Sequence, residues 1–178
     1  PYFPWKKKFI LIFKKLDGAA YSSTSTLTPA HLQQVGQALA QMHRQTRTSR
    51  FSPHRFTARA IHQVYREIQQ PLAQKFPPLA VELGQWMQWL IKRPKIILPA
   101  GLIHGDLFLE NLHFKKGHLV GILDFEAAGH GPFLFDIAVT LHALCYQKNQ
   151  FQPGLAKAFL HGYEKRRKIS RQEKQALN

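Results

Sequence analysis

Apolar side chains recur at helical spacing along most of the first half of the chain. Between residues 28 and 42 they follow one another at steps of three and four, and glutamines occupy the opposite face. Such spacing lines up one apolar stripe along a helix, and its members are Leu32, Val35, Leu39 and Met42. Thr28 and Pro29 supply an N-cap and a first-turn proline, so the pattern predicts a helix from there to about residue 42.

Four further segments have helical rather than alternating spacing, namely residues 55–70, 79–91, 133–146 and 153–167. Prolines at positions 71, 77, 78 and 94 flank the first two, and we expect them to interrupt the helices. Ser170 and Glu173 form the pattern of a capping box. They predict the start of one more helix, which we expect to bury nothing before the chain ends.

Two short segments favour β-structure. Residues 9–13 form an apolar, aromatic and β-branched run flanked by lysines, which fits a strand buried on both faces. Residues 112–114, a turn at 115–117 and residues 118–125 have the pattern of a β-hairpin, in which Gly117 is free to adopt positive φ. The sequence therefore predicts a helix-rich α+β fold with a short hairpin in its second half.

The composition narrows the class of protein. The chain has 178 residues, 44% of them hydrophobic, which is enough for one domain with a substantial core and excludes intrinsic disorder. The single cysteine, Cys145, cannot form an internal disulfide, so we expect a reducing, cytoplasmic location. The most apolar segment contains Asp136 and is shorter than the roughly 20 residues of a membrane span, so no membrane partner is expected.

The charge is strongly positive, with 25 Lys and Arg against 10 Asp and Glu and a formal net charge of +15. This balance predicts attraction to polyanions such as nucleic acid, acidic lipid or nucleotide phosphate. The basic runs at 6–8, 14–15 and 165–168 are not interleaved with the aromatic side chains that a stacking nucleic-acid surface needs. A solvated basic surface is therefore favoured, and a nucleic-acid-binding domain is the less favoured alternative.

Acidic side chains cluster in one part of the chain, because three of its four aspartates, Asp106, Asp124 and Asp136, lie within 31 residues. Kinases need a carboxylate that accepts the proton of the substrate hydroxyl, and an amide oxygen with a second carboxylate that hold Mg²⁺. Asp106 and Asn111 are five positions apart, as in the kinase catalytic loop, and a hairpin would return Asp124 to Asn111. We predict that these three converge on an open cavity, where Asn111 and Asp124 could share a cation at about 2.1 Å.

Two nearby residues are interpreted as structural supports. His104 lies two positions before Asp106 and is better understood as a packed scaffold for the loop than as a proton carrier. Asp136 lies on an otherwise apolar helix and must find hydrogen-bond donors in the interior. We expect it to brace the backbone of the loop.

Two alternative roles are open to the same residues. Asp106 and Asn111 could be turn residues that bond to their own backbone. Asp124 argues against this, because it closes an apolar strand outside a turn, where an unpaired carboxylate is costly. A metal hydrolase could instead gather nitrogen and oxygen ligands here, although their spacings match no compact zinc signature. Those ligands would be His104, Asp106, His113, Asp124, Glu126 and His130.

The segment 101–146 resembles the catalytic core of the aminoglycoside phosphotransferase and choline kinase superfamily. The resemblance rests on the run from Gly101 through Asn111 and on the run from Gly121 through Asp136. Within that superfamily the segment is most similar to bacterial homoserine kinases. Weaker similarity covers residues 9–43, where residues 13–18 resemble the hinge of the family, and the tail from residue 162 onward.

This resemblance implies a kinase-like fold in which Asp106 is the catalytic base and Asn111 and Asp124 are Mg²⁺ ligands. It also implies ATP at a hinge formed by Lys14, Lys15 and Leu16, and transfer of the γ-phosphoryl group to the hydroxyl of L-homoserine, a step of threonine biosynthesis. Glu126 and His130 are candidates for contacts to an amino-acid substrate. Another aminoglycoside- or choline-type acceptor, or an inactive kinase remnant, is the alternative.

The same resemblance implies a division of the chain. Residues 1–18 would be the last strand of the small lobe and the hinge, and residues 19–178 a catalytic lobe that is incomplete at its C-terminus. The phosphate-covering loop and the lysine of the small lobe have no counterpart here, so they would lie on another segment or another chain. We therefore expect the 178 residues alone to have little or no kinase activity.

Overall fold

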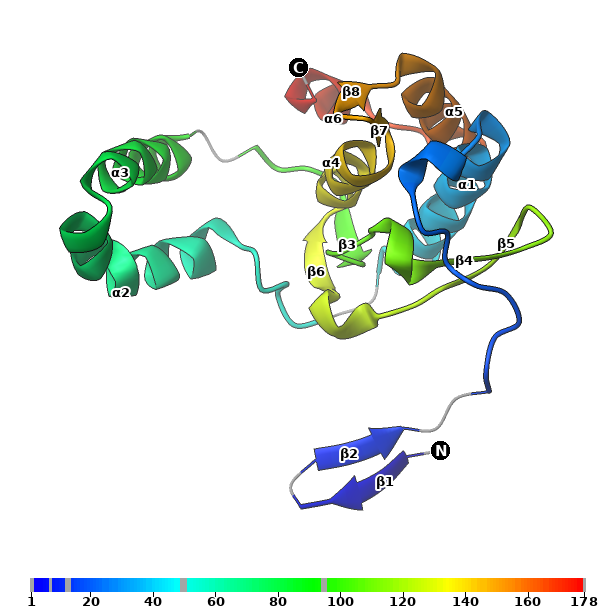
Figure 1. The fold of residues 1–178 in the computed structure, drawn as a ribbon, viewed down its shortest axis with the longest axis horizontal. Helices are drawn as coiled ribbons and strands as arrows, with labels where there is room; N and C mark the ends of the chain where they lie inside the picture. Colours follow the sequence, from blue (N-terminus) through cyan, green and yellow to red (C-terminus); the bar gives the residue numbers. More distant parts are fainter. Residues whose placement is uncertain (1, 7, 12–13, 49–50, 94–95, 178) are drawn as a thin grey trace.

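The computed structural model describes residues 2–6, 8–11, 14–48, 51–93 and 96–177 (Figure 1). Helices and short antiparallel strands form a main body, and two hairpins extend from it. One is a β-hairpin of β1 (Tyr2–Trp5) and β2 (Lys8–Leu11). Strand β2 overlaps the strand predicted at residues 9–13, of which residues 12 and 13 lie outside the described part. No helix of the described residues is both long and apolar enough to cross a membrane.

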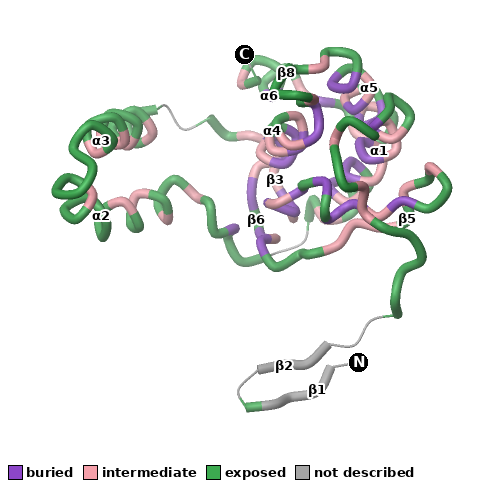
Figure 2. Tube along the Cα trace, viewed as in Figure 1, coloured by how far each residue is buried: buried purple, intermediate pink, exposed green. Residues whose placement is uncertain are grey.

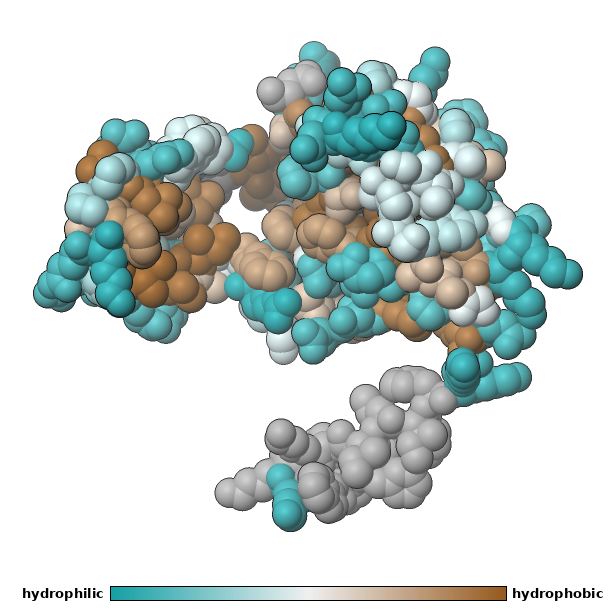
Figure 3. Space-filling model, viewed as in Figure 1, coloured by the Kyte–Doolittle hydropathy of each residue, from teal (hydrophilic) through white to brown (hydrophobic). Residues whose placement is uncertain are grey.

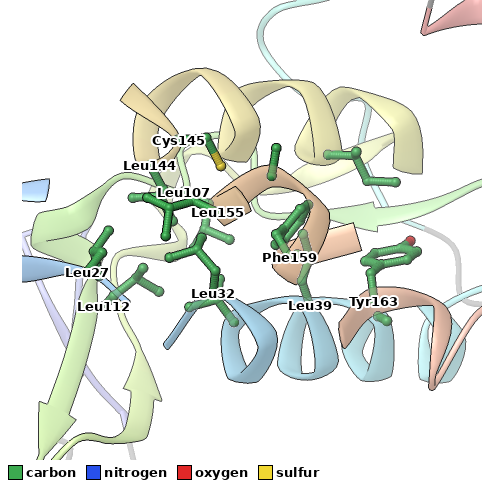
Figure 4. Close-up of a cluster of buried hydrophobic side chains, with 14 of the residues drawn as sticks. Leu27, Leu32, Leu39, Leu107, Leu112, Leu144, Cys145, Leu155, Phe159 and Tyr163 are labelled. Atoms are coloured by element: carbon green, nitrogen blue, oxygen red, sulfur yellow. The ribbon is translucent and has the colours of Figure 1, made fainter. Parts of the chain in front are cut away.

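Two helices form the centre of the core, α1 (Pro29–Gln45) and α5 (Pro153–Glu164), and they share the most extensive contact between helices. The predicted apolar stripe of α1 faces α5, and three of its members, Leu32, Val35 and Leu39, are fully buried (Figures 2 and 4). Thr28 caps α1 through its side chain, as its position before Pro29 predicts. This helix is confirmed and runs three residues beyond its expected end.

The remaining helices of the body are α4 (Phe133–Leu144) and α6 (Arg171–Ala176). Strand β3 (Ala100–Ile103) pairs with β6 (Gly129–Pro132), and β7 (Tyr146–Gln147) pairs with β8 (Gln150–Phe151). A short 3₁₀ turn, η1, spans Thr24–Thr26. The expectation that the last helix buries nothing is wrong, because Glu173 of α6 is fully buried and pairs with Arg167.

The second extension is a helical hairpin of α2 (Ala58–Lys75) and α3 (Pro77–Lys92), which pack mainly on each other (Figure 1). Pro71 lies inside α2, so the prediction that the helix stops before this proline is wrong. The proline deprives Glu67 of an N–H donor, but Glu67 is exposed and water can satisfy its carbonyl. Apolar side chains gather on this hairpin and line a cavity of about 460 Å³ between its helices (Figure 3).

The predicted β-hairpin in the second half is confirmed as β4 (Leu112–Lys115) and β5 (His118–Ile122). Gly117 has φ of +77° in its turn. Strand β5 ends three residues earlier than expected, because the chain then enters a 3₁₀ turn, η3 (Phe125–Ala127). Another 3₁₀ turn, η2 (Leu109–Asn111), leads into β4, and Leu107 and Leu112 on either side of it are buried in the core (Figure 4).

Candidate active site

The loop between β3 and η2 carries Asp106, a partly buried residue at the edge of the core. Asn111 lies at the end of η2 and is almost fully buried. Its side-chain nitrogen donates a hydrogen bond to the backbone oxygen of Asp106 at 2.8 Å. This bond commits the amide nitrogen, so the amide oxygen of Asn111 is the atom left to face a ligand.

Asp124 follows β5 at the base of the hairpin and is exposed. The backbone nitrogen of Leu123 donates to the backbone oxygen of Asn111 at 2.9 Å, which fixes Asp124 one residue from this contact. The prediction that Asp124 lies outside a turn is wrong. The residue has φ of 60° and caps η3, where its Oδ1 accepts from the backbone nitrogen of Glu126 at 3.4 Å.

The left-handed conformation of Asp124 is uncommon for a residue other than glycine, and aspartate is among the side chains that tolerate it. The turn follows the end of β5 and leads into η3. It leaves the carboxylate in solvent, so the desolvation cost foreseen from the sequence does not arise. Among the described residues, one weak backbone contact engages the carboxylate, through Oδ1.

His104 ties the loop to the strand that leads to Asp124. Its ring is fully buried. Nδ1 accepts a hydrogen bond from the backbone nitrogen of Asp106 at 3.3 Å, so Nε2 carries the proton and donates to the backbone oxygen of Leu123 at 2.8 Å. Both ring nitrogens are therefore engaged by backbone, and His104 has no free nitrogen for a proton relay or a metal.

Asp136, near the start of α4, braces the other side of the loop. Its Oδ2 accepts from the backbone nitrogen of His104 at 2.7 Å, and its Oδ1 accepts from that of Gly105 at 2.8 Å. A third donor is Nε2 of His43, 2.9 Å from Oδ2. All of these groups are buried, so the carboxylate exchanges its hydration for three hydrogen bonds and holds the backbone that precedes Asp106.

The bracing extends through the core to the end of the chain. Nδ1 of His43 lies 2.7 Å from the hydroxyl of Tyr163, which accepts from Arg167 at 3.1 Å. Arg167 in turn donates to both carboxylate oxygens of Glu173 at 2.9 and 3.0 Å. Because Tyr163 accepts from Arg167, its own proton points at His43, and His43 donates from Nε2 to Asp136. One directed hydrogen-bond chain thus joins α6, α5 and α1 to the loop.

Sequence reasoning missed His43 and Tyr163 as members of this chain. A signal was present, because His43 lies four residues after Leu39 and therefore on the buried stripe of α1. A buried histidine needs two partners, and Asp136 was already predicted to need donors in the interior. Matching these two unsatisfied groups would have suggested the contact.

Burial lowers the pKa of His43 below its ordinary value near 6.5, because desolvation outweighs the favourable contact with Asp136. The unfolded chain therefore binds a proton at this residue at a higher pH than the folded protein does. Between the folded pKa and about 6.5, the free energy of unfolding should decrease as the pH falls. Urea unfolding at about pH 7.5 and about pH 5.5 measures this slope.

The variant His43→Gln provides the control for this pH dependence. It should be less stable at neutral pH and should show a smaller slope. Part of the slope should remain, because burial also lowers the pKa of His54. An unchanged slope in the variant would contradict the assignment of His43 as the buried neutral group.

The other predicted site residues are exposed. Lys14, Lys15 and Leu16 lie on the irregular segment between β2 and η1, and the Leu16 side chain packs over Gly121 of β5. Glu126 lies in η3 and His130 in β6. The backbone of β6 also contacts the segment that leads into α2, since the nitrogen of His130 donates to the oxygen of Ser52 at 2.7 Å.

The metal-hydrolase alternative is contradicted by the placement of its proposed ligands. Among the residues that the structure describes, no three or more His, Cys, Asp or Glu side chains are grouped so that they could hold a metal ion. His104, the ligand nearest to Asp106 in the sequence, has both nitrogens bound to backbone.

Comparison with known proteins decides the family. The model of the phosphotransferase enzyme family, APH, matches residues 5–174, which is nearly the whole chain. The chain belongs to this phosphotransferase family. The resemblance of residues 101–146 in the sequence is thereby confirmed at the level of the family.

Curated homoserine kinases are among the proteins to which the chain is similar. It is 33% identical to the homoserine kinase of Beijerinckia indica subsp. indica over 150 residues, which are 80% of this chain and 45% of the relative. It is also 33% identical to that of Mesorhizobium japonicum over 154 residues, 84% of this chain and 48% of the relative. The chain thus spans less than half the length of these relatives.

Solved structures show the same fold. An amicoumacin kinase in complex with AMP-PNP and Ca²⁺ aligns with a TM-score of 0.62 at 21% identity, over 88% of this chain and 49% of the other. A putative aminoglycoside phosphotransferase from Ralstonia eutropha also gives a TM-score of 0.62, at 18% identity, over 88% of this chain and 55% of the other. The predicted helix-rich α+β, kinase-like fold is confirmed.

Proposed function

We propose that this protein is the catalytic lobe of an ATP-dependent phosphotransferase that acts on the hydroxyl of L-homoserine. The observation that carries the proposal is the loop that places Asp106 and Asn111 together and joins Asn111 by its backbone to the residue before Asp124. This is the set of groups that phosphoryl transfer requires. Family membership supports the reaction class, and the names of the curated relatives support the acceptor.

In the proposed reaction, Asp106 accepts the proton of the substrate hydroxyl as its oxygen attacks the γ-phosphorus of ATP. The bond from the γ-phosphorus to the oxygen that bridges it to the β-phosphate breaks, and ADP leaves. Asp106 can serve this role because its carboxylate forms no ion pair with the cations that the structure describes. Two sets of hydrogen bonds hold the backbone of Asp106. Its nitrogen donates to His104, which is bound to the backbone oxygen of Leu123, and its oxygen accepts from the side chain of Asn111.

The residues present fit a divalent cation. The Asn111 amide oxygen and the Asp124 carboxylate are hard oxygen ligands of the kind that Mg²⁺ prefers, and Asp124 is open to solvent. They would hold Mg²⁺, which when bound neutralises charge on the phosphates. Asn111 is held through its nitrogen, and the Asp124 carboxylate makes a contact of 3.4 Å to the backbone nitrogen of Glu126.

We further propose that residues 1–18 belong to the last strand and the hinge of the small lobe, and residues 19–178 to the catalytic lobe. Lys14, Lys15 and Leu16 would then lie beside the nucleotide, and the contact of Leu16 with Gly121 supports a position next to the hairpin. Glu126 and His130, both exposed, would contact the ammonium and carboxylate groups of the acceptor. A cytoplasmic location fits such a reaction.

Nucleotide binding with and without Mg²⁺ tests the proposal on the 178 residues themselves. AMP-PNP should bind more tightly when Mg²⁺ is present, and Asp124→Ala should remove this gain, at least about tenfold, while leaving Mg²⁺-free binding unchanged. Glu110→Ala, also an exposed carboxylate beside Asn111, is the matched control and should retain the gain. If Mg²⁺ does not affect binding to the unmodified chain, the proposed cation site is wrong.

The identity of the acceptor is tested in a form of the protein that includes the small lobe and turns over ATP. ADP release with L-homoserine should exceed release with choline or with an aminoglycoside. A preference for one of the other acceptors would leave the phosphotransferase reaction in place and overturn the choice of homoserine. A form with a complete nucleotide site that transfers phosphate to none of them would instead identify an inactive remnant.

A further inference from the structure

A second cavity lies behind the loop, where the end of α1 meets the segment between α5 and α6. Its volume is about 300 Å³, at the lower end of the range for small-molecule sites. None of the residues proposed to bind ATP, Mg²⁺ or the acceptor lines it. The described residues around it are His43, Arg44, Arg47, Pro99, Phe133, Arg167, Lys168, Ser170 and Glu173.

The cavity has an excess of positive charge. Glu173 is the one carboxylate among its described lining residues, and Arg167 and the backbone nitrogen of Ser170 already occupy both of its oxygens. Three cations then remain. Arg44, Arg47 and Lys168 form no ion pair with any carboxylate that the structure describes.

Only one of these three cations is stabilised by the helix to which it belongs. Arg44 lies in the last turn of α1, where a cation interacts favourably with the helix dipole. Arg47 and Lys168 lie outside the helices. The carboxylate of Glu164 is near enough to Lys168 to feel its charge, but it pairs with Lys174 at 3.1 Å. Three like charges around one hollow repel each other, and an anion between them would relieve this repulsion.

The wall of the cavity is apolar as well as basic. Half-buried Pro99 lines it, and behind it lies the fully buried ring of Phe133, which stacks with His43 at 4.4 Å and lies under the guanidinium of Arg167 at 4.7 Å. Such a wall can contact carbon atoms, whereas exposed arginines and a lysine recognise phosphate oxygens. A bare inorganic anion would leave the apolar wall unused.

We propose that this cavity binds a small organic phosphate, with Arg44, Arg47 and Lys168 around the phosphate group and Pro99 against the organic part. The site is separate from the proposed reaction and does not depend on it. Its wall includes His43, which is one hydrogen bond from Asp136, so an occupant would lie beside the chain that braces the loop.

Titration of the 178-residue chain with phenyl phosphate, in buffer containing EDTA, tests this site by calorimetry. The unmodified chain should bind one molecule in a saturable manner. The variant Arg44→Gln/Arg47→Gln/Lys168→Gln should bind at least about tenfold more weakly, because it lacks all three phosphate contacts. The matched control is Lys116→Gln/Lys148→Gln/Lys157→Gln, which removes the same charge from exposed positions elsewhere and should bind within about twofold of the unmodified chain.

Equal weakening in the two triple variants would overturn the proposal, because the attraction would then come from net charge alone. Inorganic phosphate that binds as tightly as phenyl phosphate would also overturn it, since the apolar wall would contribute nothing. If the cavity variant does not fold, as judged by circular dichroism, Arg47→Gln alone decides the matter. This exposed residue lies beyond the end of α1, and its loss should weaken binding about three- to fivefold; unchanged binding would contradict the site.

Discussion

Replacing Asp106 by Asn should lower kcat for phosphoryl transfer about 10²- to 10⁴-fold, in a form of the protein that turns over ATP. The amide has nearly the same shape as the carboxylate, but it cannot accept the hydroxyl proton. Because proton transfer takes place in the transition state, KM for the acceptor should change little. Steady-state ADP release at varied acceptor concentration separates the two parameters.

The variant Asp136→Asn is the informative comparison for Asp106. The new amide would keep one acceptor oxygen but would place an NH₂ group against one of the backbone donors that now bind the carboxylate. We expect lower stability together with lower kcat, whereas Asp106→Asn should unfold at the same urea concentration as the unmodified protein. If Asp106→Asn retains full turnover, Asp106 is not the base.

Replacing Gly162 by Ala should destabilise the fold by about 3 kcal/mol or more, the upper end of the usual cost of overpacking. A Cβ at this position would lie 2.8 Å from the Cα of Gln33, on the backbone of α1. Backbone atoms cannot rotate away as a side chain can, so the helices would have to separate. Gly36→Ala should behave alike, because its Cβ would lie 2.8 Å from the backbone nitrogen of Tyr163.

The same helix supplies the control. Gly154 lies in the first turn of α5, and a Cβ there would meet no atom within 4 Å. Gly154→Ala should therefore be neutral or stabilising by up to about 1 kcal/mol, since alanine favours the helix. Urea unfolding followed by circular dichroism compares the three variants. Similar midpoints for Gly162→Ala and Gly154→Ala would show that α1 and α5 are not in close contact.

Much of the fold follows from local pattern in the sequence. The apolar stripe and cap of α1, the tight turn at Gly117 and the capping box at Ser170 each depend on residues a few positions apart, and each is present. Helix ends were less predictable. Pro71 is tolerated within α2 because that part of the helix is exposed, and exposure is set by tertiary structure rather than by the proline itself.

The candidate active site was likewise predictable only in part. The spacing of Asp106 and Asn111 and the return of the hairpin were readable, because they depend on one short stretch of chain. The left-handed turn at Asp124 was not, since β5 gives no signal of where it stops. The contacts of His43 with Asp136 and Tyr163 join residues 93 and 120 positions apart. Periodicity places His43 on the buried stripe of α1, but it does not by itself report which distant residue His43 contacts.

The close contact of α1 with α5 has a consequence for how the protein is made. Gly36 of α1 lies against Phe159 and Tyr163 of α5, more than one hundred residues later in the chain. During synthesis from the N-terminus, α1 leaves the ribosome long before its main partner exists. Its apolar stripe must then stay uncovered, or be held by a chaperone, until α5 has been translated. Closing so long a loop also makes the pairing of these helices a late and slow step of folding.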